Sequence, residues 1–263
     1  MPSREWDSTS YHRISAPQVS WGTKVLSRLA LRGDEILLDA GCGTGRLTAE
    51  LLNRLPQGRV VAVDLSQNML HAARQFLEPQ FGKRATFAAV DVQFLPFVRA
   101  FDGIFSTATF HWVLDHPPLF RSLFRALRPG GWLYAQCGGG PNLARLRQRV
   151  AILKRRPEYT SFLGSYNDPW CFSDPETAAQ QLREAGFVQV ETSLEAAPTL
   201  LDDAAHYAEF VSTAILHPHL GRLPDAGLRQ QFLQEVTQQA AEDDPPFSLD
   251  YWRLNLSARV PAA

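Results

Sequence analysis

Three glycines on alternate positions, directly after an apolar run, constrain this chain more than any other feature. The segment reads ILLDAGCGTGRLT over residues 36–48, with Asp39 near the end of the apolar run and Gly41, Gly43 and Gly45 in the turn. This pattern predicts a buried strand, a tight loop and an amphipathic helix beginning near Arg46. Such a loop directs backbone N–H groups and the positive end of a helix dipole toward a ligand.

Strands and helices alternate through the first half of the chain. Apolar runs at 35–40, 59–64, 85–91, 101–107 and 132–137 are separated by helical patterns at 46–55, 67–81 and 117–131. This alternation predicts βαβ units and a parallel sheet, which binds ligands outside the carboxyl ends of its strands.

The regular alternation of strands and helices ends after Gly138. We expect a helix carrying many arginines from about 143, a loop at 165–173, a helix at 175–185 and a sixth strand at 187–195. Residues 203–241 read as two helical pieces separated by HPHLGRLP, and 249–260 as a closing strand. The expected fold is therefore α/β, with a Rossmann-like, seven-stranded, mostly parallel sheet, helices on both faces, and helical insertions after strands five and six.

Carboxylates end three successive expected strands. Asp39 is followed by Asp64 at the end of VVAVD and by Asp91 at the end of TFAAVD. A carboxylate at the end of the second strand can accept hydrogen bonds from both hydroxyls of a ribose. Asp91 can accept from the amine of an adenine, with Leu65, Met69 and Val92 as apolar cover. The pattern predicts a site for an adenosine without phosphates.

Two other nucleotide motifs fit the glycine loop less well. A Walker loop requires Gly-Lys followed by Ser or Thr, whereas Gly45 is followed by Arg46 and Leu47. The dinucleotide fingerprint requires a glycine at position 46, which disfavours NAD without excluding it.

Four segments resemble the successive motifs of class I S-adenosylmethionine-dependent methyltransferases. They read LLDAGCGTGRLT, VVAVDLSQNML, FAAVDVQFLPF and FRALRPGGWL, and the resemblance covers residues 34–137. WDSTSYHRISAPQVSWGTKVL near the start, and TATFHWVLDHPPLF after the fourth strand, resemble the trans-aconitate and juvenile-hormone-acid methyltransferase branch.

The resemblance implies a role for each part of the site. Asp39 and the loop face the methionine end of S-adenosylmethionine, Asp64 binds the ribose, and Asp91 with Val92 holds the adenine. The backbone near Ser106 is expected to lie close to the methionine part of the cofactor. The N-terminal segment covers the cofactor. The implied cofactor-binding residues are Tyr11, Gln18, Asp39, Gly41, Gly43, Thr44, Gly45, Asp64, Leu65, Met69, Asp91, Val92 and Ser106. The glycines are expected where a Cβ would collide with the cofactor.

The acceptor side of the site is less defined. His111 and Trp112, after the fourth strand, are candidates to position the acceptor, although core packing of Trp112 and a solvated His111 are equally good readings. The expected reaction is O-methylation of a small molecule such as a carboxylic acid, with His111 as the nearest base for an acceptor that needs one. A quinone, a carrier-bound acyl group, a natural-product scaffold, a nucleic acid or a non-catalytic regulator remain alternatives.

Composition excludes a general attraction to nucleic acid or membrane. The 263 residues carry a formal charge of −1, and no run reaches the roughly 18–20 apolar residues of a membrane span. Three cysteines without a CxxC pair indicate a cytoplasmic protein without disulfides. His217 and His219 lack companion metal ligands, so no metal is expected. The arginines at 145–156 read as a solvated helix surface. We expect one domain over 1–263, with 1–33 covering the cofactor, 34–137 as the cofactor-binding core, and 138–175 and 200–245 as lids. The sequence leaves the oligomeric state open.

Overall fold

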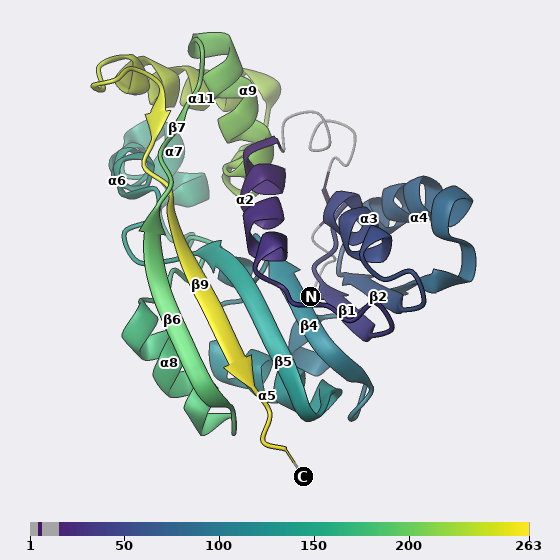
Figure 1. Ribbon diagram of the computed structural model, residues 1–263. Coiled ribbons are helices and arrows are strands. Elements are labelled where there is room, and N and C mark those ends of the chain that lie inside the picture. Colours follow the sequence, from purple (N-terminus) through teal and green to yellow (C-terminus); the bar gives the residue numbers. More distant parts are fainter. Residues whose placement is uncertain (1–4, 7–15, 263) are drawn as a thin grey trace. The chain divides into compact units, whose positions relative to one another are not determined.

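The structure is a computed structural model that describes residues 5–6 and 16–262, with the side chains of 16–18 excepted. The described chain divides into two compact units (Figure 1). One unit comprises the residues up to 140 together with 171–195 and those from 253 onward, and the other comprises 141–170 and 196–252. The single domain and the lid roles stay predictions.

A seven-stranded sheet forms the centre of the first unit. Its order is β3-β2-β1-β4-β5-β9-β6. The strands are β1 (Ile36–Ala40), β2 (Arg59–Asp64), β3 (Ala85–Ala89), β4 (Phe101–Thr107), β5 (Leu127–Gly138), β6 (Val188–Ala196) and β9 (Trp252–Arg259). The strands β1 to β5 pair in parallel, whereas β9 is antiparallel to β5. The α/β fold predicted from the alternating pattern is confirmed.

Helices cover both faces of this sheet. One apolar core lies between the sheet and α2 (Ala16–Ser27), α3 (Arg46–Asn53) and α4 (Gln67–Phe81). The other core lies between the sheet and α5 (His116–Ala126) and α8 (Pro175–Glu184). In Figure 1, α2 crosses in front of the strands and α5 and α8 lie behind them. The sheet is buried on both faces, which explains why its inner strands read as unbroken apolar runs.

Several boundaries differ from the sequence-based expectation. Strand β5 begins at Leu127, five residues early, because the chain leaves α5 directly into the sheet and passes through Gly130 with φ +76°. Strand β3 ends at Ala89, so Asp91 lies beyond the strand and caps the 3-10 turn Val92–Phe94. HPHL, expected as a break, forms the short helix α10 (His217–Leu220).

The second unit is mainly helical. It contains α6 (Ala144–Leu153), α7 (Pro157–Leu163), α9 (Ala204–Ala214), α10, α11 (Ala226–Ala241), and the two-stranded pair β7 (Thr199–Leu200) and β8 (Ser248–Leu249). Tyr159 of α7 is fully buried against Phe232 of α11, with ring centroids 5.0 Å apart. The pattern predicted α6, α9 and α11 but gave no sign of α7.

The basic residues of α6 and the turn after it form ion pairs inside the second unit. Arg145 and Arg149 both contact Asp243, Arg156 contacts Glu235, and Lys154 lies 3.1 Å from an oxygen of Asp168. The side chain of Arg149 is only 13% exposed. The expectation of a solvated basic surface is therefore wrong for Arg149 and Lys154, whose side chains are 13% exposed. Arg145 and Arg156 keep 35% and 44% of their side chains exposed while they form ion pairs.

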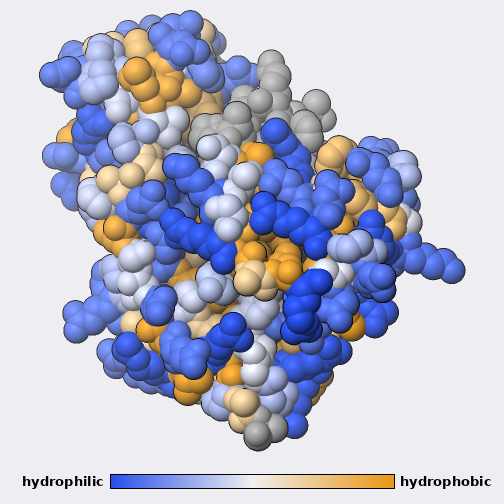
Figure 2. Space-filling view, viewed as in Figure 1, coloured by the Kyte–Doolittle hydropathy of each residue, from blue (hydrophilic) through white to orange (hydrophobic). Residues whose placement is uncertain are grey.

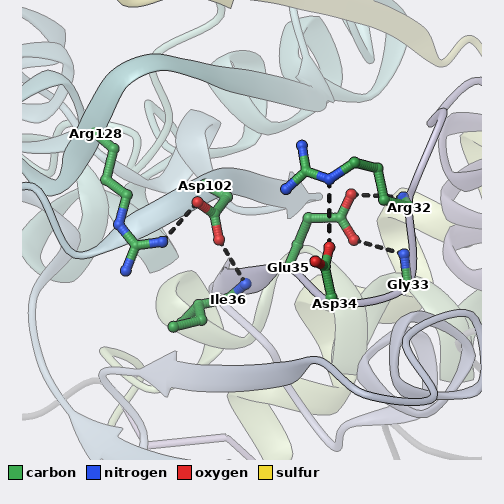
Figure 3. Close-up of polar contacts among 7 residues, drawn as sticks. All are labelled: Arg32, Gly33, Asp34, Glu35, Ile36, Asp102 and Arg128. Atoms are coloured by element: carbon green, nitrogen blue, oxygen red, sulfur yellow. Dashed lines mark hydrogen bonds and ion pairs between the residues drawn. The ribbon is translucent and has the colours of Figure 1, made fainter.

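Two carboxylates fix the start of β1 (Figure 3). This end of the strand is opposite the end that leads into the glycine loop. Glu35 is 2% exposed and accepts hydrogen bonds from the backbone N–H groups of Arg32 and Gly33. Asp102 accepts from the Ile36 N–H at 2.8 Å and from the Arg128 guanidinium at 2.6 Å. These acids satisfy backbone donors where a strand begins.

Hydrophilic residues make up most of the face in Figure 2, with apolar residues in small areas among them. Within the described ranges, no helix is both long enough and apolar enough to cross a membrane.

Substitution of Asp102 separates its two contacts. Asp102→Ala leaves the Ile36 N–H without its partner and should lower the free energy of unfolding by about 1–3 kcal/mol. Asp102→Asn keeps an oxygen acceptor and loses a partly exposed ion pair, so its cost should be below about 1 kcal/mol. Urea denaturation measures both; equal costs for the two variants would contradict the role of the Ile36 hydrogen bond.

Candidate functional site

Backbone hydrogen bonds fold the glycine loop onto the end of β2. The N–H groups of Gly41 and Cys42 donate to the Val63 carbonyl at 2.8 and 2.9 Å, and the Gly43 N–H donates to an Asp64 carboxylate oxygen at 2.9 Å. The glycines at 41, 43 and 45 have φ values of +84°, +55° and +83°. Residues other than glycine rarely adopt this left-handed conformation, so the loop requires glycine for its backbone alone.

The space around the three glycines differs. A Cβ at Gly41 would collide with the Thr109 side chain, and one at Gly45 would lie 2.8 Å from Leu77 Cδ1. A Cβ at Gly43 would meet no protein atom within 4 Å. At Gly41 and Gly45 the missing Cβ already makes room for the protein's own side chains, and the approach of a ligand to these two glycines stays a prediction. Of the three, only Gly43 has open space at the position that a Cβ would occupy.

That open space belongs to a hollow that opens to solvent. The loop, the end of β4 and the helices α2 and α3 surround it. Its lining residues are Val19, Asp39, Gly41, Cys42, Gly43, Thr44, Arg46, Leu47, Thr107 and Ala108. The hollow lies at the carboxyl ends of β1 and β4, where a parallel sheet binds its ligands.

Asp39 lies at the inner wall of this hollow and is 2% exposed. Its carboxylate accepts a hydrogen bond of 2.6 Å from the Thr48 hydroxyl in the first turn of α3. Burial raises the pKa of Asp39 to about 7, with a smaller increase from the Asp64 charge, and the Thr48 hydrogen bond opposes the increase. A buried carboxyl with this pKa favours a cationic group beside it.

Asp64, the last residue of β2, organises the loop and the start of α4. One carboxylate oxygen accepts from the Gly43 N–H, and the other accepts from the Ser66 N–H at 2.9 Å. Burial raises the pKa of Asp64 although these hydrogen bonds lower it. Among the described residues, no basic side chain forms an ion pair with Asp39, Asp64 or Asp91.

The third expected carboxylate also caps a turn. Asp91 accepts a hydrogen bond of 2.9 Å from the Gln93 N–H, so the capping role that aspartate often plays applies here. Of the three residues expected to cover an adenine, Met69 and Val92 are 3% and 7% exposed, and Leu65 is 48% exposed. Leu65 is the one with surface left for a ligand.

The Ser106 side chain is occupied in joining two strands. Its hydroxyl donates to the Ala40 carbonyl at 2.6 Å and is buried. Thr107 and Ala108, the next two residues, line the hollow, and Ala108 has φ +55° with its N–H bonded to the Gln136 carbonyl.

His111 and Trp112 form a 3-10 turn with Phe110, directly after β4. The Gly138 N–H donates to His111 Nδ1 at 3.3 Å, which places the proton of the neutral ring on Nε2. The ring stacks on Phe172, with centroids 5.8 Å apart. Neutral His111 held in this way is a hydrogen-bond donor through Nε2 rather than a base.

The N-terminal segment is described only in part. Tyr11 lies outside the described residues, and so does the side chain of Gln18. Glu5 accepts hydrogen bonds at the start of α4, from the Ser66 hydroxyl and the Gln67 and Asn68 N–H groups. Trp6 meets Trp112 edge to face, with centroids 5.1 Å apart.

Sequence reasoning missed Thr48 and Thr109. A threonine in the first turn of the helix after the loop, nine residues beyond Asp39, could have indicated the Asp39 partner. Nothing in the sequence pairs Thr109 with Gly41, because that contact joins loops from two different strands.

Comparison with known proteins identifies the family. The family model described as "Methyltransferase domain" matches residues 37–131, which contain the glycine loop. The trans-aconitate 2-methyltransferase of Azoarcus sp. is 37% identical, over 97% of this chain and 91% of its own. This chain belongs to the class I S-adenosylmethionine-dependent methyltransferases. It is an enzyme whose cofactor is S-adenosylmethionine and which methylates small molecules.

Further relatives agree with this family. A trans-aconitate 2-methyltransferase from Deinococcus radiodurans is 29% identical over 84% of each chain. A putative methyltransferase from Bacillus halodurans superposes with a TM-score of 0.64 at 20% identity, covering 92% of this chain and all of that one. The Haemonchus contortus phosphoethanolamine N-methyltransferase 2 superposes at 0.63 and 18% identity, over 97% of this chain and 57% of that one. At such identities the superpositions show the fold.

The residues around the hollow of this methyltransferase fit the cofactor. Buried carboxylates without basic partners suit a ligand that carries a sulfonium and an ammonium group. The open space at Gly43 lets a ligand approach the loop backbone.

Gly43→Ala tests the use of that open space. The variant should cost about 1 kcal/mol of stability for its left-handed φ and should weaken S-adenosylmethionine binding at least tenfold in calorimetry, because the methyl group enters the hollow. Gly130→Ala is the matched control, since Gly130 also has a positive φ and open space but lies near the opposite edge of the sheet. Equal cofactor affinity in both variants would contradict the placement of the ligand at Gly43.

Asp39→Asn tests the buried carboxyl. The folded-state pKa of about 7 exceeds the ordinary value of 3.8, so the folded protein binds more protons between these values and loses stability as pH rises through them. Without cofactor, the free energy of unfolding of Asp39→Asn relative to wild type should therefore increase from pH 4 to pH 8, as urea denaturation can measure. A difference independent of pH would show that Asp39 is ionised in the free protein.

Proposed function

We propose that this methyltransferase transfers the methyl group to a carboxylate oxygen of a small organic acid. One observation carries the proposal: relatives named trans-aconitate 2-methyltransferase align along most of the chain, at 29–37% identity. This likeness extends beyond the residues of the general methyltransferase domain.

Methylation of a carboxylate requires no catalytic base among the residues around the acceptor. A carboxylate is ionised at pH 7, so no base has to remove a proton. S-adenosylmethionine, when bound, supplies a methyl group on a positively charged sulfur that is a good leaving group. Transfer to a carboxylate oxygen would give a methyl ester and leave an uncharged sulfur in S-adenosylhomocysteine. The enzyme contributes alignment and exclusion of water.

His111 supports a carboxylate acceptor. The Gly138 N–H bound to Nδ1 favours the tautomer with its proton on Nε2, and in this proposal that N–H orients the acceptor carboxylate. A donor is useful for orienting a carboxylate and unsuited to deprotonating a phenol or amine. Trp112, next to His111 and against Trp6, contributes an aromatic wall to this region.

The cofactor is assigned to the residues that the sequence selected. In this proposal Asp39 and the loop from Gly41 to Gly45, including Thr44, hold the methionine end, and Asp64 binds the ribose. Asp91 and Val92, with Leu65 and Met69, hold the adenine, and the backbone after Ser106 adjoins the sulfonium. Tyr11 and Gln18 cover the cofactor from the N-terminal segment. No metal takes part.

Other acceptors have less support. A quinone, a carrier-bound acyl group or a natural-product scaffold would not explain the likeness to enzymes named for an acid. A nucleic acid would need free positive charge, whereas Arg145, Arg149 and Arg156 are paired with acids.

A panel of acceptors tests the reaction. Small carboxylic acids, including trans-aconitate, should yield S-adenosylhomocysteine and methyl esters, whereas phenols, quinones, amines and oligonucleotides should not. Mass spectrometry of the products identifies the methylated atom. Turnover confined to phenols or amines would overturn the proposal.

Asp64→Asn tests the ribose contact. Its amide keeps one of the two acceptor oxygens, so either the Gly43 or the Ser66 N–H loses its partner, and the charge is lost as well. Cofactor binding should weaken by about 1.5–3 kcal/mol, the worth of a hydrogen bond to a charged group. Asp34→Asn, at an exposed acid near the opposite edge of the sheet, should leave the dissociation constant unchanged. Calorimetric titration with S-adenosylmethionine distinguishes the two; an unchanged affinity in Asp64→Asn would refute this contact.

A further inference from the structure

Glu5 and Trp6 connect the segment after β2 with the turn after β4. The Glu5 carboxylate accepts hydrogen bonds from the Ser66 hydroxyl at 3.0 Å and from two backbone N–H groups in the first turn of α4 at 3.2 Å. The Trp6 ring meets the Trp112 ring edge to face, with centroids 5.1 Å apart. In the sheet, β1 lies between β2 and β4. Glu5 and Trp6 therefore join two segments that flank the glycine loop, which follows β1.

Helix α4 has a cap of its own without Glu5. The Ser66 hydroxyl accepts a hydrogen bond from the Met69 N–H, and no acidic residue lies in the first turn of the helix. Glu5 brings a carboxylate to this positive helix end from 61 positions earlier in the chain. The contact therefore serves to hold residues 5 and 6 in place more than to begin the helix.

Ser66 is shared by two carboxylates. Its backbone N–H donates to Asp64 at 2.9 Å, and its hydroxyl donates to Glu5. The other oxygen of Asp64 accepts from the Gly43 N–H. One series of hydrogen bonds thus extends from the glycine loop through Asp64 and Ser66 to Glu5. A ligand that binds Asp64 binds to a network that ends at Glu5.

The proximity of the two acids is unfavourable in the absence of a ligand. Burial is the main cause of the raised pKa of Asp64, and the negative charge of Glu5 adds to it. Like charges near each other disfavour the ionised forms of both groups. Ribose hydroxyls that donate to Asp64 would disperse its charge and reduce this repulsion. The Glu5 contact is therefore expected to be stronger when the cofactor is bound.

Trp6 extends this arrangement to the acceptor side. Its backbone carbonyl accepts a hydrogen bond of 3.2 Å from the Asn68 side chain, so the same turn of α4 holds both Glu5 and Trp6. The Trp112 ring, which Trp6 contacts, lies 5.4 Å from the His111 ring between centroids. His111 and Trp112 are the residues beside which the acceptor is proposed to bind. The position of Trp6 is thus set by α4 and forms one boundary of the acceptor region.

We propose that Glu5 is a positioning residue for methyl transfer: its contact with α4 holds Trp6 against Trp112 and completes the acceptor site when the cofactor is bound at Asp64. The inference rests on the proposed function for the location of both ligands, and it applies to any acceptor that binds beside Trp112. Glu5 acts through Ser66 and Trp6 rather than on the reacting atoms. Its loss should therefore affect binding more than the chemical step.

Glu5→Ala tests the assignment by kinetics with S-adenosylmethionine and trans-aconitate, and by calorimetric titration with S-adenosylhomocysteine. The acceptor KM should rise at least ~tenfold, because only the fraction of molecules with Trp6 in place binds the acceptor well. The dissociation constant of S-adenosylhomocysteine should rise about three- to tenfold, because Asp64 loses part of its network. At saturation with both substrates, kcat should stay within about threefold of wild type. Glu5→Gln keeps one acceptor oxygen without the charge and should lie between Glu5→Ala and wild type.

A double-mutant cycle tests whether Glu5 acts through Trp6. Trp6→Ala should raise the acceptor KM by a factor similar to that of Glu5→Ala. The double variant should be no worse than either single variant, because both substitutions remove the same arrangement. Effects that multiply in the double variant would contradict the inference.

Glu78→Ala is the matched control, because Glu78 is an exposed acid near the other end of α4. It should leave every constant unchanged. If Glu5→Ala lowers the thermal midpoint but leaves the acceptor KM and the S-adenosylhomocysteine affinity as in wild type, Glu5 only caps the helix, and the inference fails while the proposed function stands. If wild type turns over phenols or amines and no acid, the proposed function fails, and the KM for that acceptor together with the calorimetry decides on Glu5 in the same way.

Discussion

The fold of the site depends on three backbone hydrogen bonds that hold the glycine loop to the end of β2. Two of them converge on the Val63 carbonyl and the third ends on the Asp64 carboxylate. They bend the chain back across the strand ends before α3 begins, which requires positive φ at alternate residues. This bend sets the path of the chain from β1 into α3. It therefore positions Thr48 beside the buried Asp39 and places Gly43 at the opening of the hollow.

The acidic residues at the two ends of the central strands have different environments. At the end where β1 begins, the carboxylates of Glu35 and Asp102 accept hydrogen bonds from backbone N–H groups, and Asp102 also accepts one from Arg128. At the carboxyl ends of β1 and β2, burial raises the pKa values of Asp39 and Asp64, and no described basic side chain forms an ion pair with them. The first arrangement stabilises the start of a strand. In the second, burying ionised carboxylates without a cation is unfavourable, and a cationic ligand would reduce that cost.

The sequence predicted the fold well because its signals are local. Apolar runs of strand length, separated by amphipathic helices, define five βαβ-type strands, and the glycine spacing defines the loop. Long-range contacts could not be predicted in the same way. The Thr109 side chain over Gly41, and the arginines of α6 against Asp243, bring together residues distant in sequence. The contacts of Glu5 and Trp6 could not be predicted either, because they join the start of the chain to segments at least 61 positions away.

The place of β9 has a consequence for the order in which the first unit can assemble. This strand enters the sheet between β5 and β6, although more than half of the second unit separates it from β6 along the chain. Until it arrives, β6 lacks its neighbour in the sheet, and the loop that must close for this pairing is long. The cofactor loop needs only neighbouring segments near the start of the chain. A molecule in which β9 has not yet docked could therefore already possess the folded glycine loop while its sheet lacks the strand between β5 and β6.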